Sequence, residues 1–418
     1  MAIVAPSTAT QVLPAASHRH LVSASTAFRE TLIPFAASRV LLLVVTLVVV
    51  ALHGLRGLPG ATAPVGNTLA DYWNRWDSLW YLHIATNGYS AAQDLHGHVS
   101  LAFFPLYPLA LHLWLVLWPW SPAAGALVLS NLCFIGASCT LYQLVALDFG
   151  QRWAGRAVWL LALFPTGLFF FAGYSESIFL LCTLRCCYHL RLRQWWAAGI
   201  WGGLGAATRP LGVILLGPFL VSCRQSGGRD FPHRPRALLQ AAIAHVRRRP
   251  EQAAAGAIIP LGLLAYMAYL GARFGDPLAF SSSQRSWHRG WALPWQSIEA
   301  AIVRPLTHVP HLDGPTIHAM SDTTWGLVFL AISIPATRAL PRAYGVFLWL
   351  FWLEILSTPA LLDGVPSPLI SVPRFLATAF PLIIFLAGTR RRFAACCLIS
   401  IPLLIFNTAV FLSGGWVA

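Results

Sequence analysis

The stretch DYWNRWDSLWYLHIATNGYS, residues 71–90, carries the side chains best suited to chemistry in an otherwise apolar chain. If residues 73–86 form one helix, with about 100° between successive residues, Asp77 lies in the middle of an aromatic face and Gly88 ends the helix. A carboxylate on a buried face is costly unless it is paired. Asp77 is therefore a candidate base or ligand group held where membrane meets water; a structural ion pair or cap is the alternative. For Asp71 a cap or surface acid is favoured.

Three arginines are candidates for binding an anion. Arg209 lies where Pro210 should break a long apolar segment into two short halves, because proline disfavours helix at the residue before it. Arg374 directly precedes the apolar segment 375–389, and Arg289 lies in a polar loop, where a charge is often merely solvated. Charges near lipid are expensive unless paired, and the alternative for Arg209 and Arg374 is snorkelling to the interface.

Three acids need separate readings. Glu176 could pair with one of these arginines, or it could cap a helix that starts near Ser175. Asp276, in the sequence FGDP, is typical of a turn. Glu354 lies inside an apolar segment, where we expect a hydrogen bond to a neighbouring helix.

The composition indicates an all-α polytopic membrane protein. Of 418 residues, 57% are hydrophobic and only 10% are charged, and the mean hydropathy is +0.64, whereas soluble domains carry about 25% charged residues. The net charge of +14 could suggest nucleic acid, but basic residues that cluster between apolar segments are better explained by membrane topology, so no nucleic-acid partner is predicted. The eight cysteines do not fall in long polar loops, and no disulfide framework is expected.

Arginine counting gives a topology. Loops rich in arginine stay on the cytoplasmic side, which places residues 55–122 and 273–322 outside and makes residues 1–33 a disordered cytoplasmic tail without a cleavable signal. Residues 34–413 then form the transmembrane domain, with about 11 crossings and an amphipathic interface helix in the first outside loop. In this topology the chain is outside both before and after residues 101–118. We therefore favour a re-entrant or interfacial helix there, rather than a crossing.

Several blocks of the sequence resemble the PIG-V-like mannosyltransferases of the GT-C superfamily. The stretch WNRWDSLWYL (73–82) is similar to that family's first outside loop, and further similar blocks follow in the family's order: AFFPLYPL (102–109), SN (130–131), FP to YSESIF (164–179), ATRPLG (207–212), FGDPLAF to SWHRGW (274–291) and SVPRFLATAFP (371–381). The resemblance covers roughly residues 30–390 and implies a GT-C-type helix bundle. It also implies that the acid of the RWD block, here Asp77, is the catalytic residue.

The resemblance implies transfer of a sugar, expected to be mannose, from a polyprenyl phosphate to an acceptor hydroxyl by a single inverting displacement. Asp77 is then the base, and Arg209, Arg374 and Arg289 are candidates to hold the leaving phosphate. Five further residues of these blocks are candidates for substrate contact: Arg75, Trp76, Tyr81, Tyr107 and Glu176. No tightly bound metal or cofactor is expected. The partners implied are membrane lipid, the polyprenyl-phosphate sugar donor, and a glycan, glycolipid or protein acceptor of unknown identity.

Two other functions remain open. A transporter or channel would also explain the apolar segments and their charges, but it predicts repeat symmetry, and no obvious repeat is present. A scaffold that keeps the fold without catalysis is the other alternative, and the presence of Asp77 argues mildly against it. The outside loops contain no Asn-X-Ser/Thr sequence, which favours a bacterial inner membrane, with the site facing the periplasm or exterior.

Overall fold

The computed structural model describes residues 21–53, 68–92, 99–119, 121–227, 244, 246–307, 314–362, 365–367 and 369–417. The helices and strands described, in chain order, are α1 (Ala24–His53), α2 (Leu69–Tyr72), α3 (Asp77–Asn87), η2 (Ser100–Ala102), α4 (Leu106–Leu117), α5 (Pro122–Phe149), α6 (Gln151–Ala162), η3 (Gly167–Phe170), α7 (Glu176–Arg191), α8 (Trp195–Thr208), η4 (Pro210–Leu215), α9 (Leu216–Gly227), α11 (Pro250–Phe274), α12 (Ala279–Ser282), η5 (Ser283–Trp287), α13 (Pro294–Thr307), α14 (Gly314–Ala339), α15 (Arg342–Ser357), β1 (Ala360–Leu362), β2 (Val365–Ser367), α16 (Val372–Leu376), α17 (Phe380–Ala387) and α18 (Arg390–Leu412).

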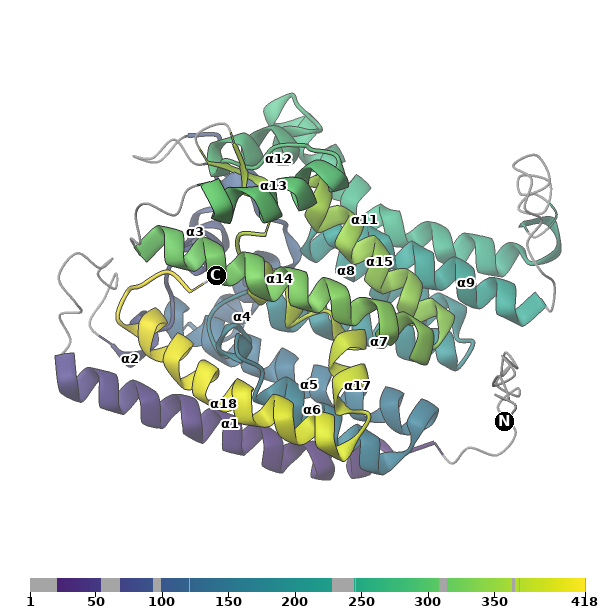
Figure 1. Cartoon of the computed structure of the whole chain (residues 1–418). Helices are drawn as coiled ribbons and strands as arrows, with labels where there is room; N and C mark the ends of the chain where they lie inside the picture. Colours follow the sequence, from purple (N-terminus) through teal and green to yellow (C-terminus); the bar gives the residue numbers. More distant parts are fainter. Residues whose placement is uncertain are drawn as a thin grey trace.

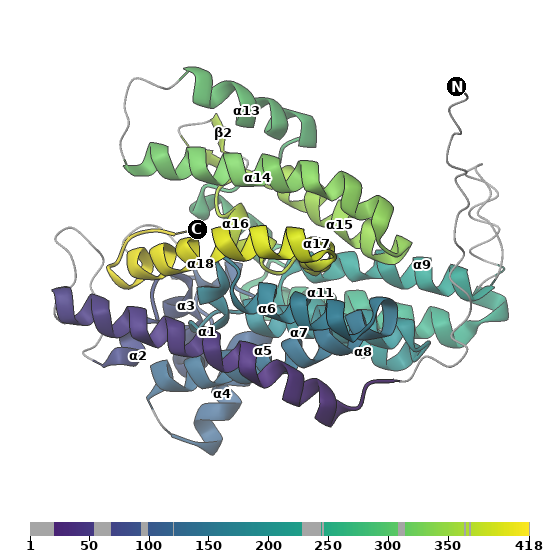
Figure 2. The same cartoon turned by 60° about the horizontal axis from the view of Figure 1, so that its bottom comes forward.

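The long helices run roughly side by side, with the short helices α2 and α3 toward one end of them (Figure 1). The end of α9, the start of α11 and the turn between α14 and α15 lie at the right of both views, whereas α2, α3 and the end of α18 lie at the left (Figure 2). These two arginine-bearing ends therefore lie at one end of the bundle, and the membrane side that arginine counting assigns to them stays a prediction. We call the opposite end, with α2, α3, α12 and α13, the outer end.

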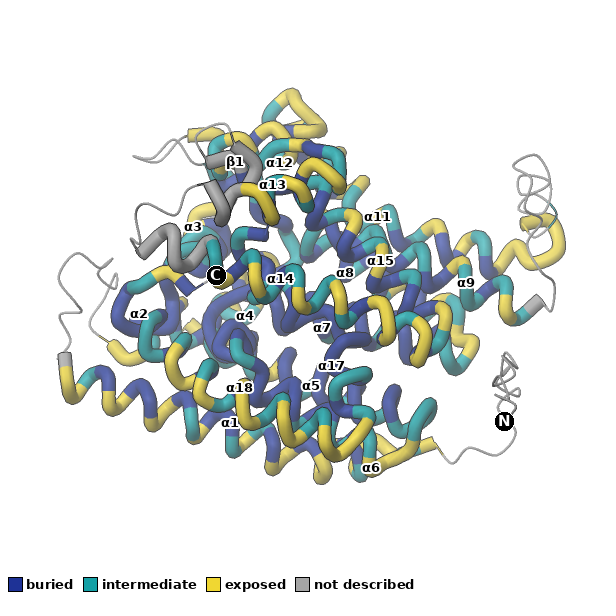
Figure 3. The backbone as a smooth tube through the Cα atoms, in the orientation of Figure 1, coloured by how far each residue is buried: buried dark blue, intermediate teal, exposed yellow. Residues whose placement is uncertain are grey.

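The helical membrane architecture is confirmed in its main feature. Four helices in the described part of the chain are long and apolar enough to cross a membrane: Ala24–Leu52, Pro122–Phe149, Pro250–Phe274 and Arg390–Leu412. Buried residues concentrate between the helices, and exposed ones follow the outer faces of α1 and α18 (Figure 3). A helix with an apolar exposed face is typical of contact with lipid. The number of about 11 crossings stays a prediction.

Close helix contact in the bundle depends on glycine. A Cβ atom added to Gly199 of α8 would lie 2.1 Å from the carbonyl oxygen of Ala255 on α11, and one added to Gly262 of α11 would lie 2.0 Å from the carbonyl oxygen of Gly203. Small residues let membrane helices approach at backbone distance. Helices α8 and α11 therefore pack at backbone distance in the segment that leads to the break at Arg209.

Two local predictions are confirmed, and whether residues 101–118 cross the membrane stays a prediction. Helix α8 ends at Thr208, Arg209 is extended, and η4 begins at Pro210, so the apolar segment does break there. Gly88 follows the last residue of α3 with a φ of 81°. Helix α4 has only 12 residues, about 18 Å at 1.5 Å per residue, which is shorter than the hydrocarbon core of about 30 Å.

Two boundaries differ from the sequence expectation. Helix α1 begins at Ala24, inside the predicted tail 1–33, because Ala27 and Thr31 are buried and the Thr31 hydroxyl lies 3.1 Å from Cys139 Sγ on α5; residues 1–20 lie outside the described part. The predicted helix over 73–86 was also wrong at its start. Trp76 has a φ of 48°, and α3 begins only at Asp77.

Candidate functional site

Asp77 is the first residue of α3, at the outer end of the bundle. The preceding turn holds Trp76 at a φ of 48°, which is uncommon for a residue other than glycine, and this turn directs the chain into the new helix. The Oδ2 atom of Asp77 lies 2.6 Å from Nη1 of Arg374, and 19% of the Asp77 side chain is exposed. The carboxylate is thus paired within the protein and still reachable from outside.

Glu176, the first residue of α7, is fully buried and joins two arginines. Its Oε1 atom accepts from Nε of Arg374 and lies 2.5 Å from Nη2 of Arg209. Its Oε2 atom has no hydrogen-bond partner among the described residues. Two guanidinium groups therefore share one carboxylate oxygen, and the second oxygen is buried without a donor among the described residues. We call Asp77, Glu176, Arg209 and Arg374 the charge cluster.

Ser175 connects the charge cluster to Tyr81. The hydroxyl of Ser175 accepts from Nε of Arg209 at 3.0 Å and lies 2.8 Å from the hydroxyl of Tyr81. Ser175 precedes α7 directly but makes no side-chain capping bond, because its hydroxyl is used in this network. Burial raises the pKa of Tyr81 to about 12, so Tyr81 is a neutral hydroxyl donor or acceptor at physiological pH.

One aromatic ring gathers three arginines. The guanidinium carbons of Arg209, Arg289 and Arg374 lie 5.7, 5.5 and 5.9 Å from the ring centroid of Phe375. Arg374 also lies over the ring of Tyr174, at 4.6 Å. Cation–π attraction offsets part of the repulsion among the like charges. These contacts hold three guanidinium groups around one ring: Arg209 directly after α8, Arg374 on α16, and Arg289 after η5.

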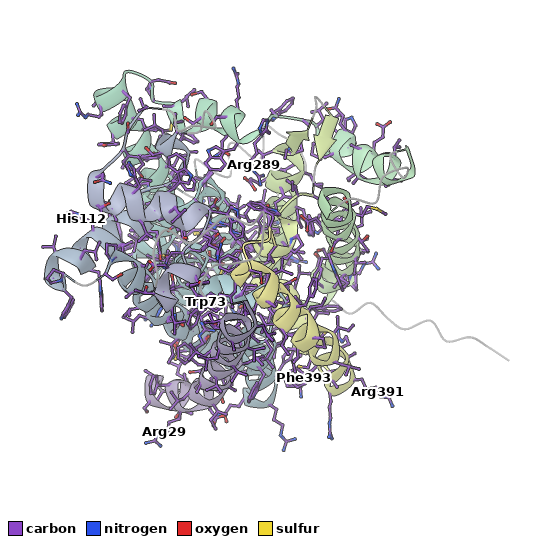
Figure 4. The ribbon with its side chains drawn as sticks, turned by 90° about the vertical axis from the view of Figure 1, so that its left-hand side faces the viewer. Arg29, Trp73, His112, Arg289, Arg391 and Phe393 are labelled. Atoms are coloured by element: carbon purple, nitrogen blue, oxygen red, sulfur yellow. The ribbon has the colours of Figure 1, made fainter. Side chains whose placement is uncertain are left out.

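Arg289 reaches this point from the segment between η5 and α13. Its Nη1 atom donates to the carbonyl oxygen of Thr358 at 3.3 Å, and its backbone pairs with Ala360. Figure 4 shows Arg289 between the outer-loop helices and the bundle. Burial lowers the pKa of Arg289 below its ordinary value, and the negative charge of Glu354 opposes this effect. Arg289 therefore belongs with the charge cluster and is not simply a solvated loop residue.

The arrangement suits an anion with sugar hydroxyls attached. Three arginines lie around Phe375, and two of them, Arg209 and Arg374, pair directly with the carboxylates of Glu176 and Asp77. Glu354 acts on Arg289 and Arg209 only through longer-range attraction. Guanidinium groups favour phosphate because their planar donors match its oxygens. A carboxylate beside them can accept a proton or a hydroxyl hydrogen bond.

The structure brings Asp77, Tyr81, Glu176, Arg209, Arg289 and Arg374 together, but it directs three other predicted contacts elsewhere. Arg75 is buried and donates from Nη2 to the carbonyl oxygen of Leu412, at the end of α18, at 2.9 Å. The ring of Trp76 packs on Phe411 and Trp416. The Tyr107 hydroxyl bonds inside the bundle, with its partners Ala126 and Ser130 on α5. These three residues bind other parts of the protein, and their contact with substrate stays a prediction.

The remaining acids have mixed outcomes. Asp71 accepts from the backbone and hydroxyl of Thr68 in a capping box, and Asp276 accepts from the backbone of Leu278 in a turn, as expected for both. The expected hydrogen bond from Glu354 to a neighbouring helix is not found within the described residues. Glu354 instead interacts electrostatically with Arg289 and Arg209.

Sequence reasoning missed Ser175 and Phe375. Ser175 stands in the block YSES and looks like an ordinary capping serine, so no local signal distinguishes its real partners. Phe375 follows Arg374 directly, and successive helix residues point about 100° apart. Its ring meets Arg209 and Arg289 only through tertiary contacts.

Comparison with known proteins identifies the first half of the chain most clearly. Residues 49–229 match the family model of the mannosyltransferases (PIG-V). The GPI alpha-1,6-mannosyltransferase 2 of Cricetulus griseus is 34% identical over 164 residues, which are 36% of this chain and 32% of that protein. The GPI mannosyltransferase 2 of Yarrowia lipolytica is 31% identical over 157 residues, 35% of this chain and 39% of that protein. The resemblance expected from the sequence blocks is confirmed for residues 49–229, and the match spans about a third of the length of these relatives.

Among solved structures, ArnT from Cupriavidus metallidurans bound to undecaprenyl phosphate is similar with a TM-score of 0.49 and 14% identity, covering 87% of this chain and 62% of ArnT. The archaeal oligosaccharyltransferase AglB from Archaeoglobus fulgidus, in complex with an inhibitory peptide and a dolichol-phosphate, is similar with a TM-score of 0.40 and 13% identity, covering 90% of this chain and 56% of AglB.

Proposed function

We propose that this protein is a membrane-embedded, inverting glycosyltransferase with a GT-C-type bundle of about 11 transmembrane helices. It moves a sugar, which we propose is mannose, from a polyprenyl phosphate to an acceptor hydroxyl at the outer end of the bundle. The observation that carries this proposal is the charge cluster, in which a reachable carboxylate lies beside arginines that suit a phosphate. The match of residues 49–229 to the mannosyltransferase family supports it independently.

In the proposed reaction, the oxygen of the acceptor hydroxyl forms a bond to the anomeric carbon of the sugar. The bond between that carbon and the phosphate oxygen breaks, and its electron pair leaves with the phosphate. Asp77 takes the proton of the acceptor hydroxyl, a role that contributes about 10²–10⁴ in rate. The sugar inverts its configuration because the acceptor attacks from the side opposite the phosphate.

Arg374 has two tasks in this proposal. Before the donor binds, it pairs with Asp77 and Glu176. When the phosphate arrives, the guanidinium is shared with it, and Asp77 becomes a better proton acceptor because part of its counter-charge is withdrawn. Arg209 and Arg289 stabilise the charge that grows on the leaving phosphate. The proposal assigns no step to a metal or cofactor.

The acceptor is a hydroxyl of a glycan, a glycolipid or a protein. The relatives named above are GPI mannosyltransferases of eukaryotes, so a glycolipid acceptor has the most direct support. Our proposal also places the protein in a bacterial inner membrane with the site facing the periplasm or exterior. An epitope-labelling experiment on the α12–α13 loop in intact cells tests the side.

The proposal is tested by reconstituting purified protein in bilayers with radiolabelled polyprenyl-phosphate mannose and membrane-extracted acceptors. Asp77→Asn is expected to lose transfer while folding and donor binding are retained. Asp71→Asn is the matched control, because Asp71 only caps a short helix six residues earlier. Equal transfer by wild type and Asp77→Asn would remove Asp77 from the mechanism.

A transporter remains the second candidate, because the break between α8 and η4 is a feature that transporters share. The same vesicles distinguish the two functions. Movement of labelled lipid or sugar across the bilayer without a glycosylated product would favour transport. A product that depends on Asp77, with no such movement, would favour the transferase.

A further inference from the structure

Asp322, on α14, is a buried acid outside the charge cluster. It is 4% exposed, and its Oδ2 atom accepts from the backbone nitrogen of Ser371 at 2.9 Å. A buried carboxylate is costly unless hydrogen bonds compensate it. The partner it has is a backbone group at the start of α16, the helix that carries Arg374.

Ser371 is a strained position. Its φ is 64°, in the left-handed region, which a residue other than glycine adopts at a cost. Its own side chain makes no capping bond to α16. The bond that the Ser371 N–H donates to Asp322 is therefore the side-chain contact on this turn, and it adds to the backbone bonds from Val372 to Leu369 and from Arg374 to Ser371.

The turn determines where Arg374 points. Helix α16 has only five residues, so its direction depends on its anchors. One anchor is the Asp322–Ser371 bond, and the other is the hydroxyl of Thr166, which donates to the carbonyl oxygen of Pro373 at 2.7 Å. In addition, Gly326 lets α14 approach this segment, because a Cβ atom there would lie 2.8 Å from Leu369.

Arg374 needs this accuracy because it must meet two acids at once. Its Nη1 atom pairs with Asp77 of α3, and its Nε atom pairs with Glu176 of α7. A displacement of about 1 Å at a reacting group can cost about 10²-fold in rate. A helix this short, starting from a strained residue, needs an external anchor to avoid such a displacement.

We propose that Asp322 is a positioning residue for the phosphate site: it fixes the Ser371 turn and thereby aims Arg374 at Asp77, Glu176 and the leaving phosphate. This inference rests on the proposed function. Asp322 does not touch substrate, and it acts through Arg374.

The test compares three variants of the full-length protein in bilayers. Asp322→Asn keeps a carbonyl acceptor for the Ser371 nitrogen and is expected to retain transfer within about threefold. Asp322→Ala loses the acceptor and is expected to lower kcat by about 10–10²-fold. Thr324→Val is the matched control on the same helix, because among the described residues the Thr324 hydroxyl bonds only to the carbonyl of Met320 within α14.

A double-mutant cycle separates positioning from general loss of structure. In an Arg374→Gln background, Asp322→Ala is expected to cost less than about a further twofold, because both changes act through one guanidinium. Fully multiplicative losses, or an Asp322→Asn variant as impaired as Asp322→Ala, would overturn the inference. If Asp322→Ala does not fold alone, all members of the cycle carry Ser371→Gly as well. Glycine adopts the left-handed turn without strain and so favours folding.

The proposed function and this inference fail differently. Absence of transfer by wild type with all acceptors would contradict the proposed function. The cycle is then measured as affinity for undecaprenyl phosphate, which reports on Arg374 without any reaction. Independent effects of the two substitutions on that affinity would contradict the positioning role of Asp322.

Discussion

Two networks of buried charge lie at opposite ends of α7, and they are built differently. At the C-terminal end, Arg191 donates from Nε and Nη2 to Oδ1 of Asp148, at 2.8 and 2.5 Å, and the Tyr344 hydroxyl donates to Oδ2 at 2.6 Å. Both oxygens of this fully buried carboxylate have partners. We call these three residues the Asp148 network, and it joins α5, α7 and α15.

The charge cluster at the N-terminal end of α7 is incomplete by comparison. Two arginines share Oε1 of Glu176, and Oε2 has no hydrogen-bond partner among the described residues. A third arginine, Arg289, stacks on the same ring without an ion pair in the described part of the chain. Asp77 remains partly exposed.

The comparison distinguishes a structural network from a binding network in physical terms. A buried charge that is fully paired contributes little beyond holding helices together, and its loss mainly lowers stability. A buried carboxylate oxygen without a donor, and a nearby arginine without an ion pair among the described residues, carry a free-energy cost that a ligand can offset. We therefore assign ligand binding to the charge cluster and not to the Asp148 network.

The largest effect is expected from Arg374→Gln. This change removes the guanidinium that Asp77 and Glu176 share, and we expect transfer to fall by about 10²–10³-fold, as for loss of a donor to developing negative charge. Arg374→Lys keeps the charge but cannot donate to two acids with a planar group, so its loss should be intermediate. Initial rates with saturating donor measure both. Unchanged transfer in Arg374→Gln would show that the charge cluster is another structural network.

A matched pair of substitutions tests the comparison directly. Glu176→Gln removes the carboxylate that competes with a phosphate, so undecaprenyl phosphate should raise the melting temperature more in this variant than in wild type. Asp148→Asn weakens the bonds to Arg191 and Tyr344 and should lower the free energy of unfolding by about 1–3 kcal/mol. Its response to the lipid should equal that of wild type.

Thermal unfolding in detergent, with and without undecaprenyl phosphate, gives both quantities. Transfer per folded molecule is the second measurement, and it should fall in Glu176→Gln but not in Asp148→Asn. Identical lipid responses in all three proteins would contradict the distinction between the two networks.

Local features of the fold could be read from the sequence. Pro210 predicts the break beside Arg209, Gly88 predicts the end of α3, and the FGDP sequence predicts the turn at Asp276, because each depends on backbone chemistry within a few residues. Glu176 was expected either to pair with an arginine or to cap a helix, and the structure selects the ion pairs. The choice needs Arg374, which is 198 residues away.

The reading of Asp77 shows the limit of helical periodicity. Its aromatic face was built on a helix that includes Trp73, but Trp73 and Trp76 lie before α3 and pack against Phe411 instead. Periodicity cannot detect a single residue with a positive φ such as Trp76, because tertiary packing stabilises that conformation. The position of Asp77 beside Arg374 therefore follows from the fold and not from the helical face.

The smallest effect is expected from Tyr81→Phe, and it sharpens the assignment of the base. The hydroxyl of Tyr81 lies 2.8 Å from that of Ser175, which also accepts from Arg209, so its loss should lower transfer by about two- to tenfold, as expected for one neutral hydrogen bond. Burial raises the pKa of Tyr81 to about 12 because it disfavours the phenolate, and the neutral phenol therefore persists from pH 5 to pH 9. The pH profile of kcat should keep its shape in Tyr81→Phe, and Trp80→Phe is a control on the same helix. If the pH profile of wild type showed a basic limb that was absent in Tyr81→Phe, Tyr81 would be the titrating group. The proton acceptor would then have to be sought on the α7 side of the charge cluster.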